Sequence, residues 1–373
     1  MFIVCIKLIM VAILANITFT PIYQPLAVLA GYCLIILSIA LPFTAMTMPL
    51  QLHVKPSMFC LIMLAVVMLS SYALEPASIN IDLAKGVLLF YCTYIAIAID
   101  NQRFTKRDLK YIFNIGKILS LIYISYTFLP FPFRYTVVNE WGATGFTMSM
   151  GNTNATAISV MFCILLLIGD ILYAEKQTTR IVDYILALAL MYTVYLLESR
   201  TIVACGLVII LFPIFRKIRI RKWHVYVALL IPIVFIALQM WLSEREAIVI
   251  LGKPLASGRH RLYLSYLNSV QSNPLDYFFG KWLVHKLGNY HNAPFAIFMN
   301  FGTIGLGLYY IFWYTELKGM LQKGNSPLST LAIIGVVAFF VHSSAEAAPM
   351  LGFVIFGAEM VIICRIAKDC GDA

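Results

Sequence analysis

The chain has 373 residues, of which 61% are hydrophobic and only 12% are charged, and its mean hydropathy is +0.88. A soluble domain carries about a quarter charged residues, so this composition excludes a water-soluble globule, a disordered chain and a disulfide scaffold. The formal net charge is +10. The basic residues lie mostly between apolar runs, where they orient a membrane protein rather than bind nucleic acid.

Long, continuous apolar runs predict an all-α, polytopic membrane protein with a single integral membrane domain over residues 1–373. A spanning helix needs about 20 apolar residues, and we expect about twelve such helices joined mostly by short loops. The predicted spans, in chain order, are residues 2–19, 26–46, 57–75, 83–99, 111–130, 154–173, 181–198, 201–215, 225–242, 292–314, 327–345 and 347–366.

The eight cysteines lie inside these apolar segments or in the C-terminal tail, and no two of them form a CxxC pair. Their placement predicts neither a disulfide framework nor a zinc site. The sequence also lacks a Gly-rich phosphate loop and a metal-ligand cluster. We therefore expect no metal and no cofactor.

Lys and Arg gather in alternate loops, most densely in residues 100–110 and 216–224. The positive-inside rule places these loops and both termini in the cytoplasm. The long loop of residues 243–290, between the ninth and tenth predicted helices, then lies on the outer face. This loop is basic as well, but long loops cross a membrane largely regardless of their charge.

Within that loop, apolar side chains recur at helical spacing from Leu262 to Val270, and Asn273-Pro274 would end the helix. We expect a short amphipathic helix that lies in the membrane interface. Arg259 stands at its start. Its guanidinium either faces water and lipid phosphate as a solvated cation or binds an anionic ligand.

Arg200 lies in a tight turn between two predicted spans, at the outer edge of the membrane. A charge at membrane depth is costly unless it is paired or hydrated. Two interpretations are open. Arg200 is either a structural partner of the nearby Glu198, or it joins Arg259 in binding phosphate through bidentate donors.

His291 and Asn292 stand at the outer start of the tenth predicted span. Histidine suits general-base chemistry near neutral pH, although an interfacial polar role is the simpler interpretation. Gly302 follows eleven residues later, about three helical turns, and Gly305 three residues after that. Small residues permit close helix packing in lipid. We expect one tightly packed helix with His291 and Gly302 on the same face.

These motifs together resemble the O-antigen polymerase and O-antigen ligase superfamily of bacterial envelope glycosyltransferases. The family signature is His-[Asn/Ser/Gln], nine residues and Gly-x-x-Gly, which His291-Asn292 and Gly302 to Gly305 match without a gap. The resemblance covers the chain from about Gly151 to Leu308.

Three further motifs carry the resemblance. Ser-Gly-Arg at Arg259, followed by Asn-Pro at Pro274, is similar to a second family element, and Arg200 is similar to a third. The Gly-Asn-Thr-Asn stretch that begins at Gly151 resembles a family Gly-Asn-x-Asn stretch, but Thr153 stands where proline is commoner.

The resemblance implies metal-independent glycosyl transfer at the periplasmic face of the bacterial inner membrane, from a glycan carried on undecaprenyl pyrophosphate. His291 would take the proton from the acceptor hydroxyl, while Arg200 and Arg259 would hold the pyrophosphate as it leaves. Gly302 and Gly305 would serve helix packing. The supporting groups would be His260, Arg261, Asn292 and Glu346.

Within this chemistry we expect a polymerase that joins lipid-linked repeat units. Its partners would be the undecaprenyl-pyrophosphate-linked oligosaccharide, membrane lipid and a chain-length regulator protein. A ligase that transfers the finished glycan to lipid A-core would use the same residues. A flippase or transporter is a further alternative, and it needs ionisable residues near the bilayer midplane. The candidates for that role are Lys117, Asp170, Asp183 and Glu359.

Overall fold

The protein is seen here in a computed structural model. It describes residues 2–45, 63, 104–129, 135–138, 144–147, 153–215, 220–242, 249–250, 253–254, 259–270, 274–280, 292–322, 326–344 and 363–370. Within these ranges the chain is mainly helical. The helices are α1 (Phe2–Ile22), α2 (Gln24–Ala45), α5 (Lys106–Phe128), α6 (Thr153–Tyr173), α7 (Gln177–Leu196), α8 (Arg200–Leu211), α9 (Lys222–Leu242), α10 (Arg259–Val270), α11 (Pro274–Phe279), α12 (Ala293–Gln322) and α13 (Pro327–Ser343), followed by a helical segment at 363–370.

The described residues contain four helices that are long and apolar enough to cross a membrane, namely α5, most of α6, α7 and most of α9. The chain is therefore a helical membrane protein. The predicted span at 83–99 lies outside the described residues, as does that at 57–75 apart from residue 63. Most of the predicted span at 347–366 lies outside them too.

Two short antiparallel hairpins were not predicted from the sequence. β1 (Tyr135–Val138) pairs with β2 (Thr144–Thr147) in the connection between α5 and α6. β3 (Val249–Ile250) pairs with β4 (Lys253–Pro254) in the connection between α9 and α10. Strands this short do not contain an alternation of apolar and polar residues that is long enough to predict a strand from the sequence.

Helix α5 begins earlier than predicted, inside the basic segment that the sequence analysis assigned to a loop. Thr105 and Asp108 form a capping box, in which the Asp108 N–H donates to Thr105 Oγ1 (3.3 Å) and the Thr105 N–H donates to Asp108 Oδ2 (3.0 Å). The box satisfies two helix-terminal N–H groups. Its Thr-x-x-Asp spacing is the sequence signal that the hydropathy reading missed.

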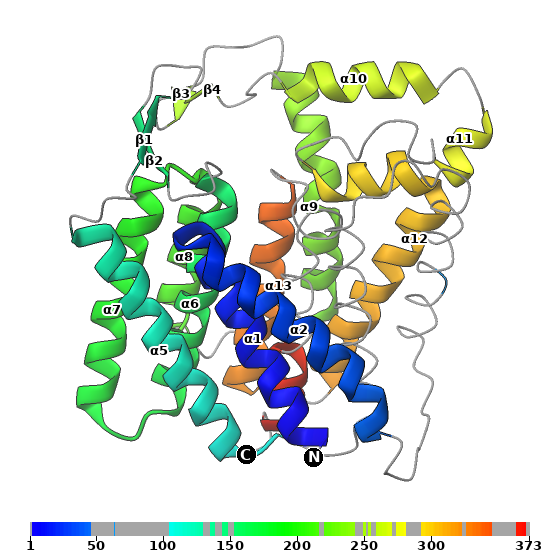
Figure 1. The fold of residues 1–373 in the computed structure, drawn as a ribbon. Helices are drawn as coiled ribbons and strands as arrows, with labels where there is room; N and C mark the ends of the chain where they lie inside the picture. The colour runs from blue at the N-terminus through cyan, green and yellow to red at the C-terminus, as the bar shows by residue number, and fades with distance from the viewer. Residues whose placement is uncertain are drawn as a thin grey trace.

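Helix α6 forms the centre of the bundle, because 89% of its spanning window is buried. It contacts α5, α7, α8 and α13, and Figure 1 shows it among these helices. Two glycines allow α5 and α6 to approach closely. A Cβ on Gly116 of α5 would lie 2.8 Å from Leu166, and one on Gly169 of α6 would lie 2.7 Å from the ring of Phe113.

The segment at 363–370 ties together one end of the bundle, the end where both chain termini lie in Figure 1. Its polar contacts reach residues in or beside α5, α6, α12 and α13. They join Phe104 N to Asp369 (3.2 Å), Tyr173 Oη to the Cys370 carbonyl (3.0 Å), Ser329 Oγ to the Ala367 carbonyl (3.3 Å) and Lys368 Nζ to Glu316 (2.7 Å). Helices α10 and α11 lie at the opposite end.

Gly169→Ala tests the close approach of α5 and α6. The added methyl group overlaps the Phe113 ring, so we expect a loss of about 1–3 kcal/mol of stability, as for other overpacked cores. Gly307→Ala is the control, since a Cβ on that helical glycine meets nothing within 4 Å. Thermal unfolding in detergent, followed by size-exclusion chromatography, measures both. Equal melting temperatures for the two variants would contradict the packing assignment.

Candidate functional site

Arg200 is the first residue of α8 and follows a tight turn after α7. In this turn Glu198 has φ 52°, a left-handed backbone that L residues rarely adopt. Ser199, the N-cap residue of α8, is 1% exposed. The turn between α7 and α8 thus takes only the three residues 197–199, and it leaves Arg200 partly buried at the start of the helix.

Arg259 occupies the corresponding first position of α10 and is also partly buried. Its positive charge acts electrostatically on Arg200, although the two residues are far apart in the sequence. The fold therefore places the two arginines of the predicted site within electrostatic range of each other. Two neighbouring guanidinium groups repel each other, and an anion placed against both relieves that repulsion.

The two residues after Arg259 lie differently in the structure. Arg261 is exposed, whereas His260 is partly buried. Among the described residues, His260 Nδ1 is buried without a hydrogen-bond partner. An imidazole nitrogen in that state can donate to a bound anion or accept from a substrate hydroxyl. The supporting roles of His260 and Arg261 stay predictions.

Helix α10 is held by Tyr263, which is 0% exposed and lies one turn after Arg259. Its ring centroid is 4.9 Å from that of Phe295 in α12, in an edge-to-face arrangement. Helical spacing puts Arg259 and Tyr263 on the same face. The face that packs on α12 is thus the one that carries Arg259, whereas Leu264, the next residue, is 42% exposed.

Asn292 is completely buried and joins three helices. Its Oδ1 accepts from the Phe295 N–H (2.9 Å), which caps the start of α12. Its Nδ2 donates to the carbonyls of Pro232 within α9 and Ser344 at the end of α13, both at 3.2 Å. Both amide donors are therefore used within the protein. The sequence analysis made Asn292 a supporting group for chemistry, and the structure gives it a scaffold role.

His291 and Glu346 lie outside the described residues. Their positions in the chain adjoin the Asn292 junction, because His291 directly precedes Asn292 and Glu346 follows Ser344 by two residues. The assignment of His291 as general base stays a prediction. The same holds for the supporting role of Glu346.

Helix α12 is broken at Gly302, where φ is 64° and ψ is −165°. A Cβ there would overlap the carbonyl of Phe278 and lie 2.5 Å from the Phe279 nitrogen, both in α11. A Cβ on Gly305 would overlap the Cβ of Phe301, just before the break. Both glycines are thus needed where the chain bends, and Gly302 packs against the α11 backbone rather than against another spanning helix.

The break corrects the prediction of one continuous helix over residues 292–314. Because the helix is broken at Gly302, the eleven residues from His291 to Gly302 do not correspond to whole turns of one helix. The prediction that these two residues share a helix face is therefore not supported. In Figure 1 the first part of α12 runs across the molecule below α10, and the remainder descends toward the end with the termini. The descending part extends to Gln322, beyond the predicted limit.

Of the three residues on which the predicted chemistry depends, the structure describes Arg200 and Arg259. The described residues contain no group of three or more His, Cys, Asp and Glu side chains that could hold a metal ion. What they present instead is a pair of guanidinium groups with His260 beside them.

Comparisons with known proteins assign no family. No protein-family model matches the chain, and no curated protein is significantly similar to it.

Asn292→Ala tests the junction. The change removes three buried hydrogen bonds and leaves the Pro232 and Ser344 carbonyls without this donor, so we expect a loss of about 2–4 kcal/mol, at ~1 kcal/mol for each bond plus the cost of unpaired groups. Asn268→Ala, at an exposed position of α10, is the control. Thermal stability in detergent is the measurement. A melting temperature equal to that of the control would show that the junction is not structural.

Proposed function

We propose that this protein is a polymerase of the O-antigen type, which joins glycan repeat units carried on undecaprenyl pyrophosphate. The observation that carries the proposal is that the partly buried Arg200 lies within the electrostatic influence of Arg259, although the two residues are far apart in the sequence. A partly buried pair of guanidinium groups suits a pyrophosphate, which offers oxygens for several charge-assisted hydrogen bonds. The resemblance to the O-antigen superfamily, on the motifs around His291, supplies the reaction.

In the proposed reaction His291 accepts the proton of an acceptor sugar hydroxyl. The hydroxyl oxygen then forms a bond to the anomeric carbon of the donor sugar, and the bond from that carbon to the pyrophosphate oxygen breaks. Arg200 and Arg259 stabilise the negative charge that develops on the leaving group. The lipid pyrophosphate is itself the leaving group, so no nucleotide is required.

The proposal includes a topology. It places about twelve spans in the bacterial inner membrane, both termini in the cytoplasm, and Arg200, Arg259 and His291 at the periplasmic face. The arrangement of the described helices supports it, because the chain termini and the helices α10 and α11 lie at opposite ends of the bundle. A chain-length regulator protein would be a partner.

A ligase that transfers the glycan to lipid A-core uses the same groups, so product analysis distinguishes the two. Purified protein is incubated with lipid-linked repeat units alone, and then with core acceptor added. A polymerase forms longer lipid-linked chains without the acceptor. A ligase reacts only when the core is present.

One observation favours a second candidate, a transporter of lipid-linked sugar. Lys117, Asp170 and Asp183 form a buried ion cluster between α5, α6 and α7, of the kind that transporters use. Movement of a fluorescent lipid-linked sugar across vesicles would support this alternative. Chain extension without such movement supports the polymerase.

The catalytic roles are tested by substitution. We expect His291→Ala to lower polymer formation by about 10²–10⁴-fold, the usual contribution of a general base. Arg200→Lys and Arg259→Lys should each lower it by about 10²-fold, because a point charge does not replace a planar fork. Arg221→Lys, at an exposed position before α9, is the matched control. Polymer length on gels and protein level in membranes are measured together. Unchanged polymer in His291→Ala would falsify the base assignment.

A further inference from the structure

A second polar cluster lies within the helical bundle, formed by charged side chains from three neighbouring helices. Lys117 of α5 lies with its Nζ 2.5 Å from Asp170 Oδ2 of α6 and 3.1 Å from Asp183 Oδ1 of α7. The sequence analysis named these residues separately as candidates for a transporter. The proposed glycosyltransferase chemistry uses none of them.

The fold brings the three together through close helix contacts. Gly116 directly precedes Lys117, and Gly169 directly precedes Asp170. At these glycines a side chain of one helix lies directly against the backbone of the other, so α5 and α6 pack closely. The Lys117 ammonium and the Asp170 carboxylate can therefore meet. Helices α6 and α7 are joined by a short turn at 174–176, which sets Asp183 opposite Asp170 across the hairpin.

The cluster is buried, and Asp183 is its most buried member. The side-chain exposures are 0% for Asp183, 12% for Asp170 and 23% for Lys117. Oδ2 of Asp183 has no hydrogen-bond partner among the described residues. A buried ionised carboxylate oxygen without a donor is costly, by several kcal/mol in an apolar medium.

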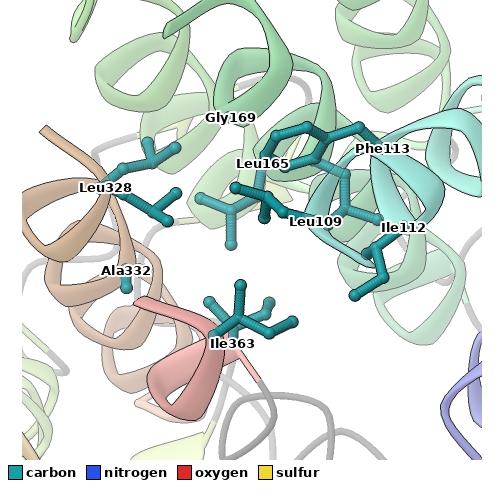
Figure 2. Close-up of a pocket in the computed structure, with 11 residues that line it drawn as sticks. Leu109, Ile112, Phe113, Leu165, Gly169, Leu328, Ala332 and Ile363 are labelled. Atoms are coloured by element: carbon teal, nitrogen blue, oxygen red, sulfur yellow. The ribbon is translucent and has the colours of Figure 1, made fainter. Parts of the chain in front are cut away.

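An apolar part of the bundle adjoins the cluster on one side. An apolar cavity of about 30 Å³ lies between α5, α6, α13 and the segment at 363–370. Its lining includes Phe113, one turn before Lys117, and Gly169, next to Asp170. Figure 2 shows aliphatic and aromatic side chains around it.

Three other titratable or charged groups on the packed elements make contacts away from the cluster. Asp108 of α5 pairs with Lys7 of α1, and Tyr173 of α6 donates to the Cys370 carbonyl. Arg180 of α7 donates to the Ala174 carbonyl. The remaining such groups on α5, α6, α7 and the turn between α6 and α7 are Lys106, Arg107, Lys110, Tyr111, Tyr123, Tyr126, Cys163, Glu175, Lys176, Tyr184, Tyr192 and Tyr195. On α8 and α13 they are Arg200, Cys205 and His342, and on α1 Cys5.

We propose that Lys117, Asp170 and Asp183 form a proton-binding site in which Asp183 is the residue that takes up one proton as the pH falls. Two ionised carboxylates and one ammonium leave a net negative charge in a buried place, and one proton makes the cluster neutral. Asp170 is the partner of Lys117 because its contact is the shorter. Asp183, which is more buried and has an oxygen without a donor, takes the proton, and its O–H can then donate within the cluster.

The bound proton holds α7 against α5 and α6. A carboxyl group that binds its proton more tightly in the folded than in the unfolded protein stabilises the fold while it is protonated. The stability of the protein is therefore highest where Asp183 is protonated, and it falls as the pH rises and the proton is lost. The proposal is independent of the glycosyltransferase assignment, because it concerns side chains outside that site.

Infrared spectroscopy of the full chain in lipid nanodiscs tests the site directly. As the pH is lowered from neutral to about 5, we expect the C=O stretch of a protonated carboxyl group to appear, and it should shift in D2O. Asp183→Asn should remove this band, since Asp170 and Lys117 then form a neutral pair. Asp108→Asn, at the other ion pair of α5, is the matched control and should keep it. Absence of the band in the unsubstituted protein, or its persistence in Asp183→Asn, overturns the proposal.

Thermal stability against pH is a second, independent measurement. The melting temperature of the unsubstituted protein should fall as the pH rises from about 4, the ordinary range of a carboxyl group, toward neutral, and Asp183→Asn should flatten this dependence while the protein stays folded. Asp108→Asn should keep the fall. Equal pH profiles in the unsubstituted protein and in Asp183→Asn contradict a proton on this residue. Loss of sugar transfer in the His291 and Arg variants has no bearing on either readout.

Discussion

The buried amide of Asn292 is the interaction on which the end of the bundle with α10 and α11 depends. In an apolar environment a polar group without a hydrogen-bond partner destabilises the fold. The Asn292 amide donates to the carbonyls of Pro232 and Ser344, and its oxygen caps α12. The start of α12 is thereby fixed against α9 and α13. Helix α10 docks on that start through the contact of Tyr263 with Phe295, so the place of Arg259 follows from the same junction.

Charged groups occur in two different settings in this bundle. Arg200 and Arg259 are like charges that the fold holds in each other's field, an arrangement that favours a bound anion. Lys117, Asp170 and Asp183 are opposite charges that meet between α5, α6 and α7, an arrangement that favours internal neutrality. The first faces the end with α10 and α11, whereas the second is enclosed by α5, α6 and α7. Their physical demands differ, and so we assign them to different tasks.

Some features that hydropathy did not reveal had other signals in the sequence. The start of α5 was encoded by the Thr105-x-x-Asp108 capping box. The meeting of Asp170 and Asp183 follows from a helical hairpin, since one lies three residues before the end of α6 and the other six after the start of α7. The spacing of Gly302 and Gly305 predicts close packing along one continuous helix, and this prediction is wrong for Gly302. Gly302 bends α12 and contacts α11, because a positive φ and a backbone neighbour both require a residue without Cβ.

The sequence by itself determined that this is a helical membrane protein and where most of the described helices lie. A long, continuous apolar run satisfies its backbone hydrogen bonds in a bilayer by forming an α-helix. It also singled out Arg200 and Arg259 as cations that need an explanation. Only the tertiary structure decided that these two act on each other, that Asn292 is scaffold, and that Lys117 meets two carboxylates. Such pairings depend on which helices pack together and at what distance, and in lipid that is decided by small residues and buried hydrogen bonds far apart in the chain.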